Sequence, residues 1–421
     1  MKKLLIIFII LLSLITGVCA EGDVSLVVSA EINSWDMFSG ASLDSIKQWL
    51  AGSKLMLDIS DEMSLAKLVY KNEPMLYIYK TPEGFQLDDN TWYEGSESAF
   101  YKLLANDDPL YNARQYYAAY NALAPTFENI CARLGGYKET KKGGSEIKKV
   151  GKPAYTEEYN ISAMELGSIW HECIAYYAQH LQDNGAEVDF VQKTSVFLSQ
   201  IIFGGNVKLI QMLDSDMQPI AWRFNGDINI YGADTRKASI LFAKNAEGLY
   251  AKIAFPAKKG KNALDINIAG SDKGGKLAMD GNFKRNLEGE TSSGSFDISL
   301  NLSQGILGKV DIKLKFGKEP QMRYTLRPKL DSAYRGTLSL VKEYDKRKLD
   351  MLFTIVDGEK IPFNKGLRIV DIESLSDKQL SIERDMLSYN NSQKLYRLIN
   401  DVPEEVRNIV LHEITRHARL I

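Results

Sequence analysis

Residues 296–302 read FDISLNL and residues 310–316 read VDIKLKF, so apolar and polar side chains alternate without a break in both stretches. Residues 264–268, LDINI, repeat the pattern. Successive side chains of a β-strand point to opposite faces of a sheet, so strict alternation predicts strands with one buried and one solvent-facing side. These stretches decide the fold class, and they predict an antiparallel sheet with one apolar face.

Weaker alternation extends this sheet over residues 219–370, with glycine-bearing turns between several of the strands. The further strands are expected at Trp222–Ile230, Ser239–Ala243, Leu249–Phe255, Lys276–Phe283, Met322–Leu326, Thr337–Val341 and Leu349–Val356. About ten strands is near the number at which an open sheet must curl or close. We therefore expect a long, curved, half-barrel-like sheet.

The segment before this sheet divides into two parts. Residues 21–95 are expected to form a β-meander with one short helix at Ser42–Leu50, capped by Ser42 and ended by Gly52. The meander strands are expected at Val24–Ile32, Lys54–Ile59, Ser64–Tyr70, Met75–Lys80 and Phe85–Leu87. Residues 96–215 are expected to be an inserted helical block that contains a mobile loop at 138–153, where we find almost nothing to bury.

The helices of this block follow from apolar residues at helical spacing. They are expected at Ser96–Leu104, Leu110–Ala124, Pro125–Leu134, Ile161–Asp183, Val188–Ile202 and Asn206–Leu213. Pro125 is expected to divide two of them, since proline suits a first helical turn but not an interior. The tail, residues 381–421, is expected to return to helix at Ser381–Ile399 and Glu404–Leu420. The fold class is thus α+β, with helices packed on the apolar face of the sheet.

The N-terminus has the order of a secretory signal peptide, predicted for residues 1–20. Lys2 and Lys3 precede an apolar run that is shorter than the roughly 20 residues needed to span a bilayer, and small residues lead to Ala20. A retained membrane anchor is the alternative. Lipid anchoring at Cys19 is not expected, because Thr16 and Val18 replace the residues that such a signal carries. We expect export to the extracellular space, the cell envelope or the periplasm.

Net charge and cysteine content narrow the function further. The formal net charge of −2 argues against bulk binding of nucleic acid. No second apolar run is long enough to span a membrane after signal cleavage. Only Cys131 and Cys173 remain in the mature chain, where export would allow a disulfide between them; two buried free thiols are the alternative.

No catalytic residue, cofactor site or metal site is predicted. The string His412-Glu413-Ile414-Thr415-Arg416-His417 spaces its histidines i, i+5, whereas two ligands on one helix face need i, i+4. His171 and His180 lie two and a half turns apart on a predicted helix, and Cys173 at i+2 from His171 cannot face it. An aromatic platform for glycan or peptidoglycan strands is one interpretation of Tyr111, Tyr116, Tyr117, Tyr120, Tyr176 and Tyr177, but such stripes at helical spacing are more often core packing.

A sheet of this length cannot leave its apolar face in water. The sheet curls on itself, or the chain's own helices cover the face, or an apolar ligand does. The predicted strands lie in Val24–Leu87 and Ala221–Val356, which together make up a little under half of the chain. These two segments resemble the LolA/LppX-like bacterial envelope proteins. That resemblance implies a half-barrel with helices in its concave face and a role as carrier of lipids or lipoproteins.

Three functional hypotheses follow. The first is a non-catalytic, exported cell-envelope protein that binds an apolar ligand or a protein partner. The second is a structural or assembly factor whose sheet is filled internally. The third and least favoured is a metal-dependent hydrolase.

Overall fold

The computed structural model describes residues 23–408, with gaps. The gaps are residues 37, 61–62, 89, 97–102, 104–108, 231–234, 247, 257–262, 288–289, 304–305, 364–367 and 405–406. The predicted signal peptide, the string His412–His417 and most of the predicted helices Ser96–Leu104 and Glu404–Leu420 lie outside the described residues.

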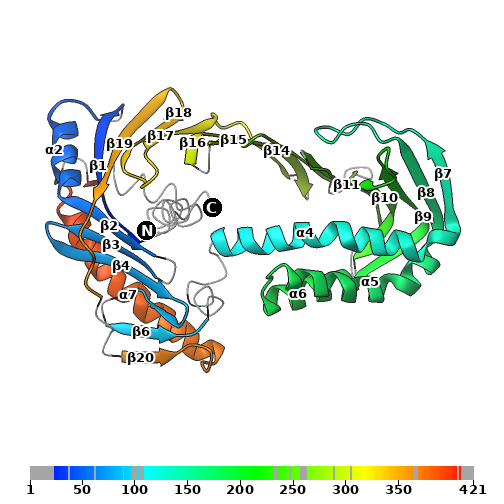
Figure 1. The fold of residues 1–421 in the computed structure, drawn as a ribbon, viewed down its shortest axis with the longest axis horizontal. Coiled ribbons are helices and arrows are strands. Elements are labelled where there is room, and N and C mark those ends of the chain that lie inside the picture. Colours follow the sequence, from blue (N-terminus) through cyan, green and yellow to red (C-terminus); the bar gives the residue numbers. More distant parts are fainter. Residues whose placement is uncertain are drawn as a thin grey trace. The chain divides into compact units, whose positions relative to one another are not determined.

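The fold is α+β, and its strands form a large, mostly antiparallel sheet (Figure 1). Among the described residues, β20 pairs with β6 in parallel, whereas the other strand pairs whose register is described are antiparallel. The chain divides into two units. Unit 1 holds residues 1–111, 302–310 and 322–421, and unit 2 holds residues 112–301 and 311–321. Strand β16 (Ile306–Phe316) contributes residues to both.

Unit 1 is a ladder in the order β17–β18–β19–β1–β2–β3–β4–β5–β6–β20. Its strands are β1 (Val24–Trp35), β2 (Ser53–Ile59), β3 (Ser64–Tyr70), β4 (Glu73–Thr81), β5 (Gly84–Gln86), β6 (Thr91–Glu94), β17 (Met322–Leu330), β18 (Gly336–Tyr344), β19 (Arg347–Asp357) and β20 (Arg368–Asp371). Its helices are α2 (Ala41–Ala51) and α7 (Asp377–Asn400). Strands β1 to β6 are consecutive in this ladder, and β6 and β20 were not predicted.

The core of unit 1 follows from which side chains face each other across its strands. Leu26 lies opposite Leu57, and Leu57 lies opposite Ala66, so their side chains share one face and are buried together. Helix α2 packs on β1 and α7 packs on β4. Ser376 begins α7 with a capping box, in which its hydroxyl accepts from Gln379 N while Gln379 Oε1 accepts from Ser376 N at 3.0 Å.

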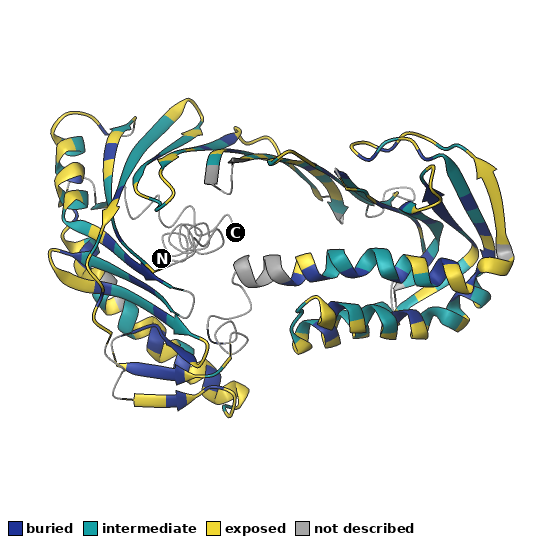
Figure 2. Cartoon of the chain, viewed as in Figure 1, coloured by how far each residue is buried: buried dark blue, intermediate teal, exposed yellow. Residues whose placement is uncertain are grey.

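Unit 2 is a ladder in the order β7–β8–β9–β10–β11–β12–β13–β14–β15. Its strands are β7 (Lys138–Lys142), β8 (Tyr155–Ser162), β9 (Ile201–Leu213), β10 (Pro219–Ile230), β11 (Arg236–Lys244), β12 (Gly248–Phe255), β13 (Ala263–Lys273), β14 (Lys276–Leu287) and β15 (Glu290–Ser303). Its helices are α4 (Pro109–Arg133, from Asn112 onward in this unit), α5 (Ala163–Asp183) and α6 (Val188–Ser199), with a short 3-10 turn, η1, at Gly135–Tyr137. Figure 2 shows that buried residues are frequent in β8 to β11 and sparse in β14.

Three predictions about residues 96–215 are wrong. Asn206–Leu213 is not a helix but part of β9, because its apolar residues are buried on both faces of the sheet and therefore lack the alternation that marks a strand. Pro125 does not end a helix and lies inside α4. The predicted loop at 138–153 has something to bury, since Ile147 and Val150 are both in a core cluster. Its mobility stays a prediction.

The start of α2 also differs from the prediction. Its N-cap is Gly40, and no side-chain hydrogen bond caps it, so Ser42 does not have the predicted role. Gly52 does follow the last residue of α2, and its backbone N–H donates to Trp49 O at 3.2 Å.

Candidate functional site

The candidate site is one face of the unit 2 sheet, on which two rows of facing residues run across six strands. Residues opposite each other in neighbouring antiparallel strands point to the same side, so each row lies on a single face. The first row is Trp222, Phe242, Ala251, Ile268, Gly281 and Phe296. The second row is Phe224, Ile240, Ile253, Ile266, Phe283 and Gly294. Every side chain in both rows is apolar.

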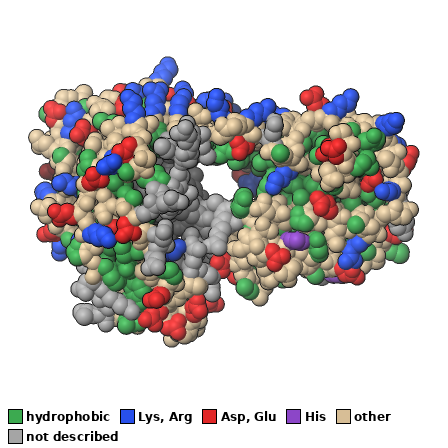
Figure 3. All heavy atoms as spheres, in the orientation of Figure 1, with side chains coloured by type: hydrophobic (Ala, Val, Ile, Leu, Met, Phe, Trp, Pro, Cys, Tyr) green, Lys and Arg blue, Asp and Glu red, His purple; other side chains and the backbone are tan. Residues whose placement is uncertain are grey.

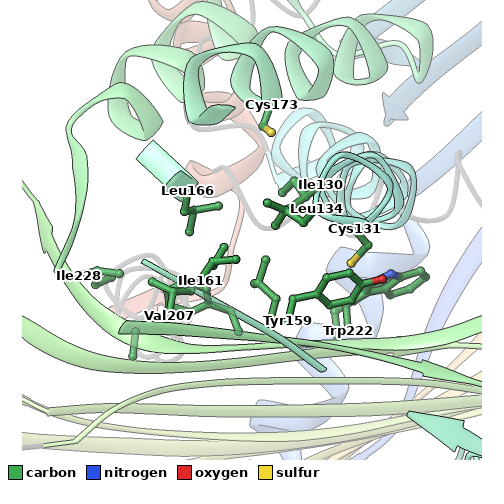
Figure 4. Close-up of a cluster of buried hydrophobic side chains, with 14 residues drawn as sticks. Ile130, Cys131, Leu134, Tyr159, Ile161, Leu166, Cys173, Val207, Trp222 and Ile228 are labelled. Atoms are coloured by element: carbon green, nitrogen blue, oxygen red, sulfur yellow. The ribbon is translucent and has the colours of Figure 1, made fainter. Parts of the chain in front are cut away.

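The part of this face on β8 to β11 is covered by helices, and we call it the covered core. Helix α5 packs on β8 and β9, α6 packs on β9, and α4 supplies buried residues to the same cluster. The members of the covered core are Ile130, Cys131, Leu134, Tyr159, Ile161, Leu166, Cys173, Val207, Leu209, Trp222, Phe224, Ile228, Ala238 and Phe242. Figure 4 shows the helix residues above and the strand residues below, with their side chains pointing toward one another. Helices do pack on the apolar face here, as predicted.

The part of the same face on β12 to β15 is not buried, and we call it the apolar floor. Its members are Ala251, Ile253, Ile266, Ile268, Met279, Phe283, Phe296 and Ile298. Seven of these side chains are half-buried, and Met279 is 41% exposed. The strands with the clearest alternation therefore keep their apolar side chains partly in contact with solvent.

Two glycine–phenylalanine pairs shape the apolar floor. Gly281 lies opposite Phe296, and Gly294 lies opposite Phe283. A Cβ atom added to either glycine would come within 2.4 Å of the facing ring. Glycine in a strand interior often marks such a close approach. Each phenylalanine ring thus lies over the backbone of the glycine opposite it, so the surface of the floor is lower at these two positions.

The opposite face of β12 to β15 is polar and hydrogen-bonded. The Tyr250 hydroxyl donates to Asn267 Oδ1 at 3.2 Å, and Asn267 Nδ2 donates to Asp265 Oδ1 at 2.6 Å. Lys313 Nζ lies 3.1 Å from Asp297 Oδ2. The two faces therefore differ in chemistry, as the alternation predicts.

Behind the covered core, the opposite face of the sheet is buried as well. Ile147 and Val150 pack on residues of β9, β10 and β11. Asn245 Nδ2 donates to Val150 O at 2.9 Å, and Lys148 Nζ lies 2.6 Å from Asp280 Oδ2. Residues 147–151, which we call the strap, thus hold the turn between β11 and β12 and reach β14.

A buried polar cluster lies at the β8 end of the covered core. The Tyr159 hydroxyl donates to Glu157 Oε2 at 2.9 Å, and Gln211 Oε1 lies 3.3 Å from the same hydroxyl. Lys138 Nζ lies 2.9 Å from Glu157 Oε1 and balances its charge. Burial, helped by the nearby Cys131 and Glu157, raises the pKa of Tyr159 above its ordinary range, so its hydroxyl is a hydrogen-bond donor at neutral pH. The cluster is satisfied by its own members.

The two cysteines are free and buried rather than bridged. Figure 4 shows the Cys131 and Cys173 side chains in different places of the covered core, where each fills space as a small apolar group. Burial, with the charges of Glu157 and Glu128 adding to it, raises the pKa of Cys131 to about 12. A thiol with so high a pKa is protonated at neutral pH and is a poor nucleophile.

The described histidines of unit 2 do not form a metal site, and His180 instead meets the Tyr176 ring with centroids 4.6 Å apart. His171 is exposed, and His180 Nδ1 faces Asp183 Oδ2 at 3.9 Å on the same helix. In the described part of the chain, no three His, Cys, Asp or Glu residues are grouped as metal ligands. Tyr116 and Tyr117 are exposed on α4, whereas the Tyr177 hydroxyl donates to Ala119 O at 3.2 Å. In Figure 3, side chains of every kind, a histidine among them, are mixed on the visible surface of unit 2.

Aromatic rings join α4 to the rows of the sheet. Phe242 stacks on Trp222 with ring centroids 5.8 Å apart and meets the edge of Tyr120 at 5.3 Å. The ammonium group of Lys244 lies 5.4 Å from the centroid of the Tyr120 ring. Sequence reasoning did not single out Lys244, Gly281 or Gly294. The signal that could have found the glycines is a residue without a side chain at an apolar position of an alternating strand.

Comparisons with known proteins add little to this description. No family model matches the chain, and no curated protein matches it. Among solved structures, a loop-deletion mutant of OmpT, an outer membrane protein of Vibrio cholerae, is similar at 9% identity over 79% of this chain and 96% of that one, with a TM-score of 0.13. A TM-score this low does not define a shared fold. No described helix is long and apolar enough to cross a membrane. The class that the fold defines is an α+β protein built on a large antiparallel sheet.

Proposed function

We propose that the protein is an exported cell-envelope protein that binds an apolar ligand on the apolar floor without catalysing a reaction. The observation that carries this proposal is the half-exposure of Ile253, Ile266, Phe283 and Phe296, which lie in the same rows as the buried residues of the covered core. Export is proposed from the signal peptide expected at residues 1–20.

The energy available to such a ligand comes from the area that the floor still exposes. Burying a side chain such as Ile, Leu or Phe fully contributes about 1.5–3 kcal/mol, and a half-buried one has part of this left to gain. Eight neighbouring apolar residues can therefore stabilise a bound hydrocarbon chain by several kcal/mol. The Phe296 and Phe283 rings occupy the space over Gly281 and Gly294, so a flexible chain would lie against these rings. The carrier role and the half-barrel shape expected from the LolA/LppX-like resemblance belong to this proposal.

A second candidate is a structural or assembly factor, and the covered core favours it. There the chain's own helices fill the apolar face, as such a factor would require. The two candidates differ in what they predict for the floor: a ligand-binding protein takes up apolar molecules there, whereas an assembly factor does not.

The test measures binding of N-phenyl-1-naphthylamine, an uncharged fluorescent probe, to the full chain. Ile298 and Ser299 are neighbours in β15 that face opposite sides of the sheet, so Ile298→Lys and Ser299→Lys form a matched pair. We expect Ile298→Lys to weaken probe binding about tenfold, because it places a charge on the floor. Ser299→Lys is expected to bind as the unmodified chain does.

Circular dichroism of both variants shows whether they keep their fold. Absence of probe binding by the unmodified chain, or equal binding by the two folded variants, would refute the proposed site. Native mass spectrometry of the gently purified protein adds a second measurement, in which a co-purifying apolar molecule is expected.

A further inference from the structure

Lys244 is the charged residue that borders the apolar floor at its covered end. It is the last residue of β11 and is on the same side of the sheet as Phe242, two residues before it. Its ammonium group contacts the Tyr120 ring, and among the described residues it pairs with no carboxylate. It is also exposed, so it is accessible from solvent.

The row that starts at Lys244 is apolar along the rest of its length. Lys244 lies opposite Leu249, and the row continues across β13, β14 and β15. Its further members are Gly270, Met279 and Ile298. Gly270 is covered by the Leu249 side chain, 3.0 Å from where a Cβ would be. Four spacings between neighbouring strands make the row about 19 Å long.

Two buried polar atoms beside Phe242 have no hydrogen-bond partner in the described structure. They are Trp222 Nε1 and the Tyr120 hydroxyl oxygen. Trp222 is 3% exposed, so its N–H cannot turn to bulk solvent. An unpaired buried donor is energetically costly, and an acceptor from outside the chain would recover that cost. This end of the row therefore has an exposed cation and, buried beside Phe242, two groups without an acceptor, whereas the rest of the row offers only hydrocarbon.

We propose that Lys244 is the head-group site for an anionic amphiphile whose acyl chain lies along the row from Leu249 to Ile298. The Lys244 ammonium group pairs with the acidic head, and the Tyr120 hydroxyl donates a hydrogen bond to it. The acyl chain covers Met279, the most exposed member of the floor. This inference rests on the proposed function, and it adds the chemical class of the ligand and the direction in which it lies.

Other charges on this face lie away from the row. Asp272 is on β13, two residues beyond Gly270, and faces Leu277 across the strands. Arg285 is on β14, six residues beyond Met279, on the same side of the sheet. Arg236 is on β11, eight residues before Lys244, and Glu290 is on β15, eight residues before Ile298, both on the same side of the sheet. None of the four is a member of the row, and Lys244 is the charged residue at its β11 end.

The test compares two probes of equal chain length, hexadecanoate and hexadecan-1-ol, as displacers of N-phenyl-1-naphthylamine from the full chain. We expect the acid to displace the probe at about tenfold lower concentration than the alcohol does. Lys244→Met keeps an unbranched side chain without the charge and is expected to abolish this preference. Lys237→Met, in the same strand on the opposite face, is the matched control and is expected to keep it.

Tyr120→Phe removes only the hydroxyl and is expected to reduce the preference about threefold. Added salt is expected to weaken acid binding and to leave alcohol binding unchanged. Equal displacement by acid and alcohol, or a preference that persists in Lys244→Met, overturns the head-group site while leaving the floor in place. Failure of the unmodified chain to bind the uncharged probe instead overturns the proposed function itself.

Discussion

Strands β8–β11 and β12–β15 of unit 2 belong to one ladder and share one apolar face, yet that face is buried only on the first group. Phe242 and Phe296 stand in the same row, but Phe242 is 2% exposed under α4 whereas Phe296 is half-buried. On the other face, the strap packs behind the first group, and a polar hydrogen-bonded surface lies behind the second. Alternation thus determines which way a side chain points, and the supply of covering elements determines whether it is buried.

The largest expected effect is a difference in stability between the two regions. Leu209→Ala in the covered core is expected to lower the free energy of unfolding by about 2–5 kcal/mol, because it removes buried contacts and leaves a cavity. Ile253→Ala on the apolar floor is expected to cost about 1 kcal/mol, because its neighbourhood is already open to water. Urea unfolding, monitored by amide hydrogen exchange at β9 and β12, measures both losses of stability.

Unit 1 provides the internal control for that experiment, since neither substitution touches it. Exchange at β2 and β3 is expected to be unchanged in both variants. Similar losses from the two substitutions would mean that the floor is as well packed as the covered core, and the contrast between them would then be wrong.

The direction of the side chains could be predicted from the sequence, whereas their cover could not. Strict alternation in residues 296–302 correctly predicts that Phe296 and Ile298 share a face opposite Asp297. The same rule fails for β9, where Ile210 and Met212 pack on the strap while Leu209 packs under the helices. A strand buried on both faces has no alternation to detect, so its segment was predicted as a helix.

The candidate site was even less accessible to sequence reasoning. The strap buries only two apolar residues, Ile147 and Val150, in a stretch otherwise rich in lysine and glycine. The position of Lys244 beside Tyr120 depends on where α4 lies against β11, and no local pattern reports a contact between residues more than a hundred positions apart. The glycine–phenylalanine pairs likewise require the register of β14 and β15, which follows from their connection and not from either strand alone.

A smaller effect is expected from filling the low part of the floor. Gly281→Ala is expected to lower the free energy of unfolding by about 1–3 kcal/mol, because the added methyl group would meet the Phe296 ring. Gly167→Ala is the matched control: nothing lies within 4 Å of its added Cβ, and it is inside α5. That substitution is expected to stabilise the protein by about 0.5–1 kcal/mol. Destabilisation by both, measured by urea unfolding, would contradict the ring–glycine packing.

The smallest expected effect concerns how dry the covered core is. The pKa of Cys131 is raised by burial from 9.0 to about 12. Between these values the unfolded chain loses the thiol proton while the folded chain keeps it, so the free energy of unfolding falls as pH rises, by up to about 1.4 kcal/mol per pH unit. The Cys131→Ala variant has no thiol and therefore lacks this pH-dependent contribution to the free energy of unfolding. Its unfolding free energy is therefore expected to fall about 1 kcal/mol less than that of the unmodified chain between pH 8 and pH 10.

Measuring the slope with pH separates this effect from the cavity that the substitution leaves, since a cavity lowers stability equally at every pH. Buried tyrosines such as Tyr177, whose pKa is raised by burial to about 12, contribute to both proteins alike and cancel in the comparison. Parallel slopes for the two proteins would mean that Cys131 ionises in the folded state as easily as in the unfolded one. Water would then reach the underside of α4, and the covered core would be no drier than the floor beside it.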